Sequence, residues 1–368
     1  MDTQKGLRLH IAIFGRTNSG KSTLMNLLTE QEASMISPKA GTTTDPVYKN
    51  MEIDGLGPVT FIDTAGTADE TELGEARMAR TAKVVDEIDG AIFIGEVEDA
   101  IAEPVAKKNI PVLKLDRPFP ERGEILKALV DLLKEKKKAP GLFDGMAVQG
   151  DHLLFVMPQD ASAPKGRLIL PQVQALREVI DKGLTATICD LNTMDAALAK
   201  LATAPDWIVT DSQVFLEVYE KKPAASKITS FSILFARAKG DMDAMMEGAK
   251  TLRHLQGDAR ILMAEACTHA PKEEDIGRVK IPAMLRKKLG EEITVDFTRG
   301  LSFPENIGDY DLIIMCGSCM FQRPVVQARV AKAKEKNVPV TNYGLVIAEA
   351  KGILDKIDSQ KFRIKNRR

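Results

Sequence analysis

The sequence predicts an α/β protein with mainly parallel sheets, built from three successive domains. Strand-length apolar runs alternate with helix-period segments almost from end to end, which is the signature of repeated β-α units. The 368 residues suffice for two or three domains that each bury their own core. The first predicted strand, at residues 9–14, runs through a loop with two glycines directly into an apolar-periodic helix.

The composition limits the classes of partner. Lys and Arg total 51 against 52 Asp and Glu, so the net charge is −1. No global field draws the protein to nucleic acid or to an anionic membrane, and we expect neither as a partner. Apolar residues make up 44% and charged residues 28%, as in folded proteins. Because no apolar run is long enough to cross a bilayer and the N-terminus enters a strand pattern directly, a cytoplasmic location is expected.

The first domain is predicted at residues 1–140. Its strands are expected at 9–14, 59–62, 90–94 and 110–115. A helix-period stretch from Glu121 to Lys138 closes this block. The Pro140-Gly141 pair that follows is typical of a domain boundary.

The second domain is predicted at residues 146–240 and the third at 241–368. In the second, strands are expected at 153–156, 186–189, 207–210 and 231–235, and helices at 172–182, 194–202 and 213–220. In the third, helices are expected at 242–255, 281–289 and 325–336, and strands at 260–264, 293–297, 311–315 and 339–342. A doubly wound block of about 90 residues is small to stand alone, so we expect its exposed sheet edge to find a partner in a homodimer.

The loop after the first strand has the composition of a phosphate-binding loop. It reads Gly15-Arg16-Thr17-Asn18-Ser19-Gly20-Lys21-Ser22, which fills the pattern G-x-x-x-x-G-K-S/T. The glycines let backbone N–H groups curl around phosphate oxygens, and the helix N-terminus adds the positive end of its dipole. Lys21 is expected to reach the β- and γ-phosphates and the Ser22 hydroxyl to bind Mg²⁺. The predicted nucleotide ligands of this segment are Gly15, Asn18, Ser19, Gly20, Lys21, Ser22 and Thr23.

Two later segments follow in the order of a nucleotide switch. In Gly41-Thr42-Thr43-Thr44-Asp45, Thr42 and Thr43 are expected to close over Mg²⁺ and the γ-phosphate. In Asp63-Thr64-Ala65-Gly66, Asp63 is expected to hold Mg²⁺ through water and the Gly66 N–H to sense the γ-phosphate. The predicted magnesium site is therefore Ser22, Thr43 and Asp63, and the predicted catalytic set is Lys21, Asn18, Thr43 and Gly66.

These three elements resemble those of the translation-factor-like GTPases. Asn18 together with the Gly41 segment is similar to the potassium-activated, TrmE/Era-like subgroup. The resemblance implies GTP and GDP as ligands, Mg²⁺ as cofactor, and a K⁺ ion seated by Asn18. Thr67 occupies the position where some GTPases keep a water-orienting glutamine, so hydrolysis is expected to be slow without K⁺ or a partner. An asparagine at position 18 also suits a turn with an unusual backbone angle.

The base-recognition element departs from this resemblance. Where such GTPases have Asn-Lys-x-Asp, the sequence reads Leu113-Lys114-Leu115-Asp116. Asp116 is still expected to accept hydrogen bonds from guanine N1 and N2, with Lys114 lying along the base. GTP is favoured over ATP because the switch elements are of the GTPase type.

Three of the four cysteines lie in the last third of the chain. Cys267 and His269 follow the predicted strand 260–264, and the C-x-x-C pair Cys316 and Cys319 follows the strand 311–315. Because ligand sites form at the carboxyl ends of parallel strands, we expect the two elements to converge. Three thiolates with a nearby imidazole can hold an iron–sulfur cluster or a tetrahedral zinc ion, and the residue types alone do not choose between them.

Over its whole length the sequence resembles the [FeFe]-hydrogenase maturation GTPases, the HydF family. The resemblance rests on the switch elements, the small middle block and the C-terminal C-x-H…C-x-x-C pattern. It implies a scaffold with a [4Fe-4S] cluster that takes a di-iron precursor from radical-SAM maturases and delivers this cargo to apo-[FeFe]-hydrogenase. By the same resemblance Cys267, Cys316 and Cys319 ligate the cluster and His269 is the candidate fourth ligand. The family often has a histidine directly before C-x-x-C, where this sequence has Met315.

Two other readings of the sequence stay open. One is a K⁺-dependent GTPase of RNA modification or ribosome assembly whose cysteines hold structural zinc. The near-zero net charge, the aromatic fraction of 5% and the lack of a recognisable RNA-binding module weigh against it. The other is a nucleotide switch without useful turnover, with which Thr67 and Leu113 are consistent.

Overall fold

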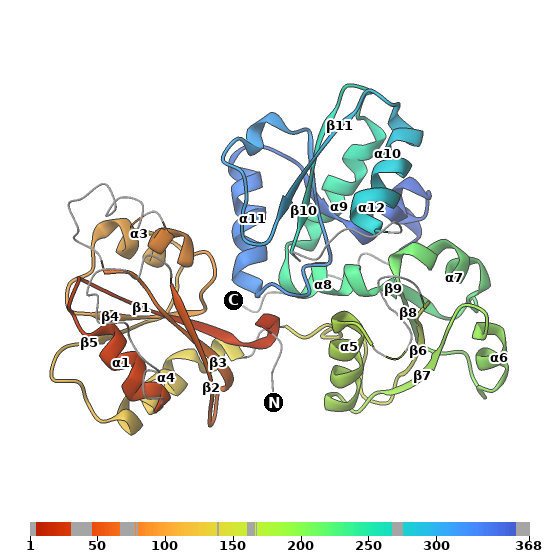
Figure 1. Ribbon diagram of the computed structural model, residues 1–368. Coiled ribbons are helices and arrows are strands. Elements are labelled where there is room, and N and C mark those ends of the chain that lie inside the picture. The colour runs from red at the N-terminus through yellow and green to blue at the C-terminus, as the bar shows by residue number, and fades with distance from the viewer. Residues whose placement is uncertain are drawn as a thin grey trace. The chain divides into compact units, whose positions relative to one another are not determined.

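The computed structural model describes residues 5–30, 46–66, 78, 80–137, 140–159, 166, 168–266 and 275–357. The chain divides into two compact units, Met1–Ala139 and Pro140–Arg368 (Figure 1). The sheets are mostly parallel and covered by helices, so the predicted α/β class is confirmed. Among the helices that the structure describes, none combines the length and the apolar character that crossing a membrane requires.

The first unit contains a five-stranded sheet in the order β2-β3-β1-β4-β5. Its strands are β1 (Leu9–Gly15), β2 (Val47–Ile53), β3 (Gly57–Asp63), β4 (Gly90–Ile94) and β5 (Val112–Leu115). All neighbours pair in parallel except β2, which runs antiparallel to β3 along the edge. The helical elements are η1 (Lys5–Leu7), α1 (Lys21–Thr29), α3 (Asp99–Lys107) and α4 (Arg122–Lys137).

Helices cover both faces of this sheet, which explains why its central strands are mainly apolar. Helices α1 and α4 lie on one side and α3 on the other (Figure 1). Ile11 and Ile13 of β1 point into the core beneath α1 and α4, whereas Ala12 and Phe14 join the core beneath α3. Strand β1 is the middle strand of the sheet, and the loop that follows it emerges at the carboxyl edge.

The second unit contains two four-stranded parallel sheets. The first, in the order β7-β6-β8-β9, is built from β6 (His152–Val156), β7 (Thr185–Cys189), β8 (Trp207–Thr210) and β9 (Lys227–Ser230). Its helical elements are α5 (Leu170–Asp181), α6 (Met194–Ala199), η2 (Ser212–Val214) and α7 (Phe215–Lys221). Strand β7 forms one edge, and its Ile188 side chain is exposed.

The second sheet of this unit has the order β11-β10-β12-β13. Its strands are β10 (Arg260–Glu265), β11 (Thr294–Arg299), β12 (Leu312–Met315) and β13 (Val340–Asn342). The helical elements are α9 (Met242–Lys250), η3 (Thr251–Arg253), the π-helix η4 (Ile276–Lys280), α10 (Ile281–Leu289), η5 (Ile307–Asp309), α11 (Arg323–Glu335), α12 (Tyr343–Ala350) and η6 (Leu354–Lys356).

The predicted strand at 231–235 is wrong, because Phe231–Lys239 forms helix α8. The Ser230 side chain caps this helix by accepting a 3.3 Å hydrogen bond from the Ile233 N–H. Nearly every residue of α8 is buried, so the helix shows no polar face from which its period could be read. The short strand β9 takes the place that the prediction gave to residues 231–235.

Helix α8 connects the two sheets of the second unit. It packs against α5 beside the first sheet and against α9, α11 and α12 beside the second. One hydrophobic core holds residues of both sheets, among them Phe155 and Val209 on one side and Leu262 and Ile313 on the other. The division into three domains, at residues 1–140, 146–240 and 241–368, stays a prediction.

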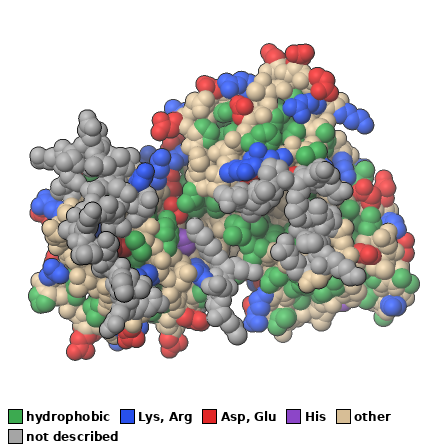
Figure 2. Space-filling model, in the orientation of Figure 1, with side chains coloured by type: hydrophobic (Ala, Val, Ile, Leu, Met, Phe, Trp, Pro, Cys, Tyr) green, Lys and Arg blue, Asp and Glu red, His purple; other side chains and the backbone are tan. Residues whose placement is uncertain are grey.

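On the face shown in Figure 2, Lys and Arg side chains are interspersed with Asp and Glu over the described surface of both units. This view therefore gives no large field of one sign, in keeping with the balanced composition.

Candidate functional site

The phosphate loop lies between β1 and α1, where the sequence pattern predicts it. Gly20 precedes the helix with a φ of +96°, a conformation that favours glycine. Asn18 has a φ of +64°, so its residue type also suits the local backbone. A side chain on Gly15 would begin 2.6 Å from Ser19 Oγ and 2.9 Å from the Ile94 carbonyl oxygen, so any larger residue there would force the neighbouring atoms to shift.

Lys21 is held across the loop rather than extended into solvent. Its Nζ donates hydrogen bonds of 2.9 Å to the carbonyl oxygens of Gly15 and Arg16. Burial lowers the pKa of Lys21, and the carboxylate of Asp63 opposes that effect. A buried ammonium already fixed to the loop needs little reorganisation to bind a phosphate oxygen.

Ser22 and Asp63 are brought together from distant parts of the sequence. The Ser22 hydroxyl donates a 2.7 Å hydrogen bond to Asp63 Oδ2. Asp63 Oδ1 is buried and has no hydrogen-bond partner in the part of the chain that the structure describes. Burial raises the pKa of Asp63, while Ser22, Lys21 and Lys49 oppose the rise. A hydroxyl beside a free, buried carboxylate oxygen is a donor set that fits Mg²⁺.

Gly66, the glycine of the second predicted switch segment, also lies against the phosphate loop. A side chain on Gly66 would begin 2.6 Å from both Cα and Oγ1 of Thr17. The predicted residues Thr42 and Thr43, together with Thr67, lie outside the described residues.

The base-recognition residues lie at the end of β5. Leu113 is partly buried against the core beneath α1 and α4, and Lys114 and Asp116 are exposed. Lys114 lines a hollow of about 560 Å³ together with Arg16 of the phosphate loop. The predicted set therefore gathers around one loop: Gly15, Asn18, Ser19, Gly20, Lys21, Ser22, Asp63 and Gly66 at its centre, Lys114 at the adjoining hollow, and Thr23 and Asp116 on exposed neighbouring positions.

Sequence reasoning did not identify Arg117, the residue after Asp116. A side chain on Gly20 would begin 2.9 Å from Cζ, Nε and Nη2 of Arg117, so the guanidinium packs on the start of α1. Its Cζ lies 5.6 Å from the centre of the Phe119 ring. The arrangement brings a positive charge to the helix end where phosphate is expected.

The C-x-x-C pair lies at the carboxyl end of β12, and both thiols are partly buried. Cys316 Sγ accepts hydrogen bonds from the N–H groups of Ala266, at 3.1 Å, and Ser318, at 3.4 Å. Two amides directed at one sulfur suit a thiolate ligand, because such hydrogen bonds are common at iron–sulfur sites. The contact with Ala266 also places the end of β10, directly before Cys267, beside Cys316.

Cys267 and His269 themselves lie outside the described residues, so their predicted convergence with Cys316 and Cys319 is not described. Within the described ranges, no group of three His, Cys, Asp or Glu side chains stands ready to hold a metal ion.

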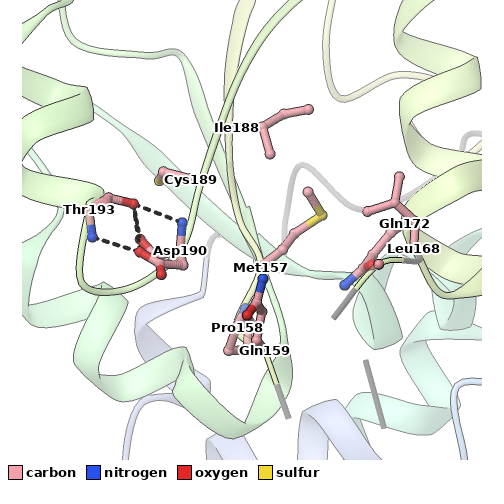
Figure 3. Close-up of a pocket in the computed structure, with 10 residues that line it drawn as sticks. Met157, Pro158, Gln159, Leu168, Gln172, Ile188, Cys189, Asp190 and Thr193 are labelled. Carbon is pink, nitrogen blue, oxygen red and sulfur yellow. Dashed lines mark hydrogen bonds between the residues drawn. The ribbon is translucent and has the colours of Figure 1, made fainter. Parts of the chain in front are cut away.

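A separate hollow of about 570 Å³ lies at the ends of β6 and β7 (Figure 3). Burial and the neighbouring Asp190 raise the pKa of its Cys189 thiol to about 11, so this thiol stays protonated at neutral pH. Asp190 accepts hydrogen bonds from the N–H and hydroxyl of Thr193, at 2.7 and 2.6 Å, and so serves the local turn. The sequence predicts no functional role for the residues that line this hollow.

Three family models match successive parts of the chain. A model described as "50S ribosome-binding GTPase" matches residues 10–119. A "Hydrogen maturase F dimerization domain" matches residues 142–240, and a "Hydrogen maturase F tetramerization domain" matches 243–358. The phosphate loop and the Ser22–Asp63 pair thus belong to a GTPase domain. With both C-terminal segments matched, the chain belongs to the hydrogen maturase F (HydF) family, as the sequence resemblance predicts.

Individual relatives are similar to part of the chain. The tRNA modification GTPase MnmE of Ruegeria pomeroyi is 31% identical over 145 residues, 36% of this chain and 34% of that protein. GTPase Der of Nautilia profundicola is 38% identical over 98 residues, 26% of this chain and 21% of its own length. GTPase Der of Campylobacter concisus is 31% identical over 192 residues, 48% of this chain and 41% of its own. The chain thus spans less than half the length of each of these relatives.

Proposed function

We propose that the protein is a GTP-binding and GTP-hydrolysing scaffold of [FeFe]-hydrogenase maturation. It holds a [4Fe-4S] cluster and delivers a di-iron precursor to apo-[FeFe]-hydrogenase. One observation supports the proposal above all: a single chain of the hydrogen maturase F family contains two kinds of site. The first is a phosphate loop beside an Asp63 oxygen that has no hydrogen bond in the described structure, and the second is a cysteine pair in which Cys316 Sγ accepts amide hydrogen bonds. Nucleotide hydrolysis then changes the surfaces offered to partners, while the cysteine site holds the metal.

At the nucleotide site the chain's own residues bind and orient GTP. Lys21 neutralises charge on the β- and γ-phosphates from its fixed place on the loop. Ser22, Asp63 and Thr43 are the residues that would hold Mg²⁺. Mg²⁺ supplies the positive charge that offsets the charge developing on the phosphate oxygens. Gly66 packs on Thr17 of the phosphate loop. Its contact with the γ-phosphate therefore changes the conformation of the segment that follows it.

Asn18 is proposed to seat K⁺ beside the phosphates, in the position where other systems place an arginine. Asp116 and Lys114 are proposed to read guanine, and GDP remains as the product ligand. Because Leu113 packs into the core, the usual asparagine contact is missing and guanine reading depends on these two residues.

At the cysteine site, Cys267, Cys316 and Cys319 are proposed as the cluster ligands and His269 as an exchangeable fourth ligand. The cluster supplies an iron that can take an additional ligand when three cysteines hold the other positions. Amides of Ala266 and Ser318 orient Cys316 Sγ for this role. With Met315 before the pair, the fourth position is not closed by a neighbouring histidine.

The assembly and the partners are part of the same proposal. The matched dimerization and tetramerization domains support self-association, and we assign the homodimer to residues 142–240. Radical-SAM maturases are the proposed donors of the di-iron cargo and the apo-hydrogenase its acceptor. We place these steps in the cytoplasm, with no nucleic acid or membrane involved.

The nucleotide half of the proposal is tested by steady-state hydrolysis of GTP and ATP in matched KCl and NaCl buffers. We expect GTP to be hydrolysed faster than ATP, and faster in KCl. Asn18→Ala is expected to remove the difference between the two salts while keeping GTP binding. Equal affinity for ATP and GTP, or no turnover in either salt, would contradict the GTPase assignment.

The delivery half is tested with the full chain incubated anaerobically with the maturases and then re-isolated. Addition to apo-hydrogenase is expected to start hydrogen evolution, and Cys316→Ser protein treated in the same way is expected to give none. Full activation by the variant would contradict a role of the cysteine site in carrying the precursor.

A further inference from the structure

Two buried cations stand beside the cysteine pair, and neither is used by the proposed ligation. The first is Lys239, the last residue of α8, whose side chain is 8% exposed. Its Nζ donates hydrogen bonds to the carbonyl oxygens of Ser318 and Cys319, both at 3.2 Å, and of Phe321, at 2.6 Å. The ammonium is therefore fixed inside the curve of the C-x-x-C loop.

The second cation is Arg329 of α11, which is 3% exposed. Its Nη2 donates hydrogen bonds to the carbonyl oxygens of Gly300 and Ser302. The guanidinium carbon lies 5.0 Å from the centre of the Phe303 ring and 4.7 Å from that of Phe321. Nη1 is buried and has no hydrogen-bond partner among the described residues. A rigid guanidinium with one unused donor is suited to an anion.

No carboxylate within the described ranges forms an ion pair with Lys239 or Arg329, whose contacts there are carbonyl oxygens and aromatic rings. Burial lowers the pKa of Lys239 to about 8 and that of Arg329 to about 10. The groups that oppose these shifts are cysteine sulfurs: Cys319 and Cys316 for the lysine, and Cys316 for the arginine. A thiolate at these cysteines would therefore stabilise the charged form of both cations.

Burying two cations without a carboxylate is costly unless an anion shares the space. A [4Fe-4S] core held by three thiolates is such an anion, because it carries net negative charge in its common oxidation states and becomes more negative on reduction. Net charge near the cluster is one of the factors that set its reduction potential. Nearby fixed cations favour the reduced form.

We propose that Lys239 and Arg329 form a buried cationic cradle that compensates the negative charge of the cluster at Cys316 and Cys319 and makes its reduction potential less negative. Both are positioning residues, since they act through the cluster loop and not as ligands. The inference rests on the proposed cluster-binding function. Because Lys239 ends the helix that joins the two sheets, it also ties the cluster loop to the dimerization segment.

The test is the midpoint potential of the reconstituted cluster in the full chain, from EPR-monitored redox titration, with iron and sulfide content measured in parallel. Lys239→Met and Arg329→Met keep side-chain bulk and remove the charge. Each is expected to shift the potential to more negative values, and the double variant further. Lys239→Arg is expected to stay near the wild type. Lys334→Met is the matched control, because it removes an exposed cation of α11 that pairs with Asp241, and it should leave the potential unchanged.

If Lys239→Met and Arg329→Met both keep full iron content and an unchanged midpoint potential, the proposed role of the cradle is refuted. The proposed scaffold function would still stand. If Lys239→Met assembles no cluster but Lys239→Arg does, the charge requirement is supported. If both fail to assemble one, Lys239 serves only to shape the loop and its part in the cradle is refuted. A wild-type protein that takes up no iron–sulfur cluster would instead remove the proposed function itself.

Discussion

Ser22 and Asp63, 41 positions apart in the sequence, are joined by a 2.7 Å hydrogen bond from the serine hydroxyl to the carboxylate. The bond links the first turn of α1 to the last residue of β3. Both side chains belong to the proposed magnesium site. The remaining Asp63 oxygen stays buried without a hydrogen bond in the described structure, so the pair is arranged for a further positive partner.

Asp63→Asn tests this arrangement through stability and activity together. Because burial raises the folded-state pKa of Asp63, ionising it costs stability, and the cost grows as pH rises through that raised pKa. We expect the variant without nucleotide to melt at a higher temperature than the wild type at about pH 7.5, with the gain shrinking towards about pH 4. Mg²⁺-dependent GTP hydrolysis should fall by about tenfold or more. A lower melting temperature at neutral pH would contradict the account of Asp63.

Lys21→Ala is expected to abolish nucleotide binding, weakening GTP affinity by about 100-fold or more, because the ammonium fixed over the loop is lost. Iron content should be unchanged, since the cysteine site belongs to the other compact unit. Fluorescent-nucleotide titration and iron analysis of one preparation measure both. Lys127→Ala, which removes an exposed lysine of α4, is the control and should bind GTP normally. Loss of iron in Lys21→Ala would show that the units depend on each other for folding.

Asp116→Asn tests how the base is read without the usual asparagine. A carboxylate accepts hydrogen bonds from guanine N1 and N2, whereas an amide can also donate to the oxygen that xanthine carries in place of the guanine amine. We expect GTP affinity to fall by about 100-fold and XTP affinity to rise. Competition titrations with GTP, XTP and ATP measure the change. An unaltered order of affinities would mean that Asp116 does not contact the base.

Cys316→Ser and Cys319→Ser are each expected to remove most of the iron while leaving GTP affinity within about twofold, because a serine hydroxyl is a poor ligand for iron–sulfur clusters. Cys189→Ser is the control, since the Cys189 thiol has a pKa raised to about 11 and lies apart from the pair. Iron analysis and visible absorption after anaerobic reconstitution report the result. Equal iron loss in the control would argue against a specific site.

Gly248→Ala tests the packing of α9 on β13, which supports the sheet carrying the cysteine pair. An added side chain would begin 2.1 Å from the Val340 carbonyl oxygen, so backbone must move. We expect a loss of about 2 kcal/mol or more in unfolding free energy, measured by urea denaturation. Gly123→Ala, in α4 with open space around it, is the opposite case and should be neutral or stabilise by about 0.5 kcal/mol. Similar effects from both would contradict the packing argument.

The phosphate loop could be predicted because its chemistry is contiguous: the strand, both glycines and Lys21 fall within one short segment. Helix α8 could not, since burial on all sides removes the polar face that reveals a helical period. Helix α12 was not predicted either, for the same reason: most of Tyr343–Ala350 is buried. Lys239 and Arg329 are distant from the cysteines in sequence, and only the packing of α8 and α11 brings them to the loop. Arg117 had one signal, its place directly after Asp116.

The proposed function requires one chain to combine a GTPase domain with an iron–sulfur site. The most direct test is iron, sulfide and zinc analysis of the anaerobically reconstituted wild-type protein, with EPR of the reduced sample. We expect about four irons and four sulfides per chain, no zinc, and a [4Fe-4S]⁺ signal that changes when imidazole or cyanide is added. Stoichiometric zinc with no competence for a cluster would contradict it, and would favour the GTPase of RNA modification or ribosome assembly with a structural zinc site.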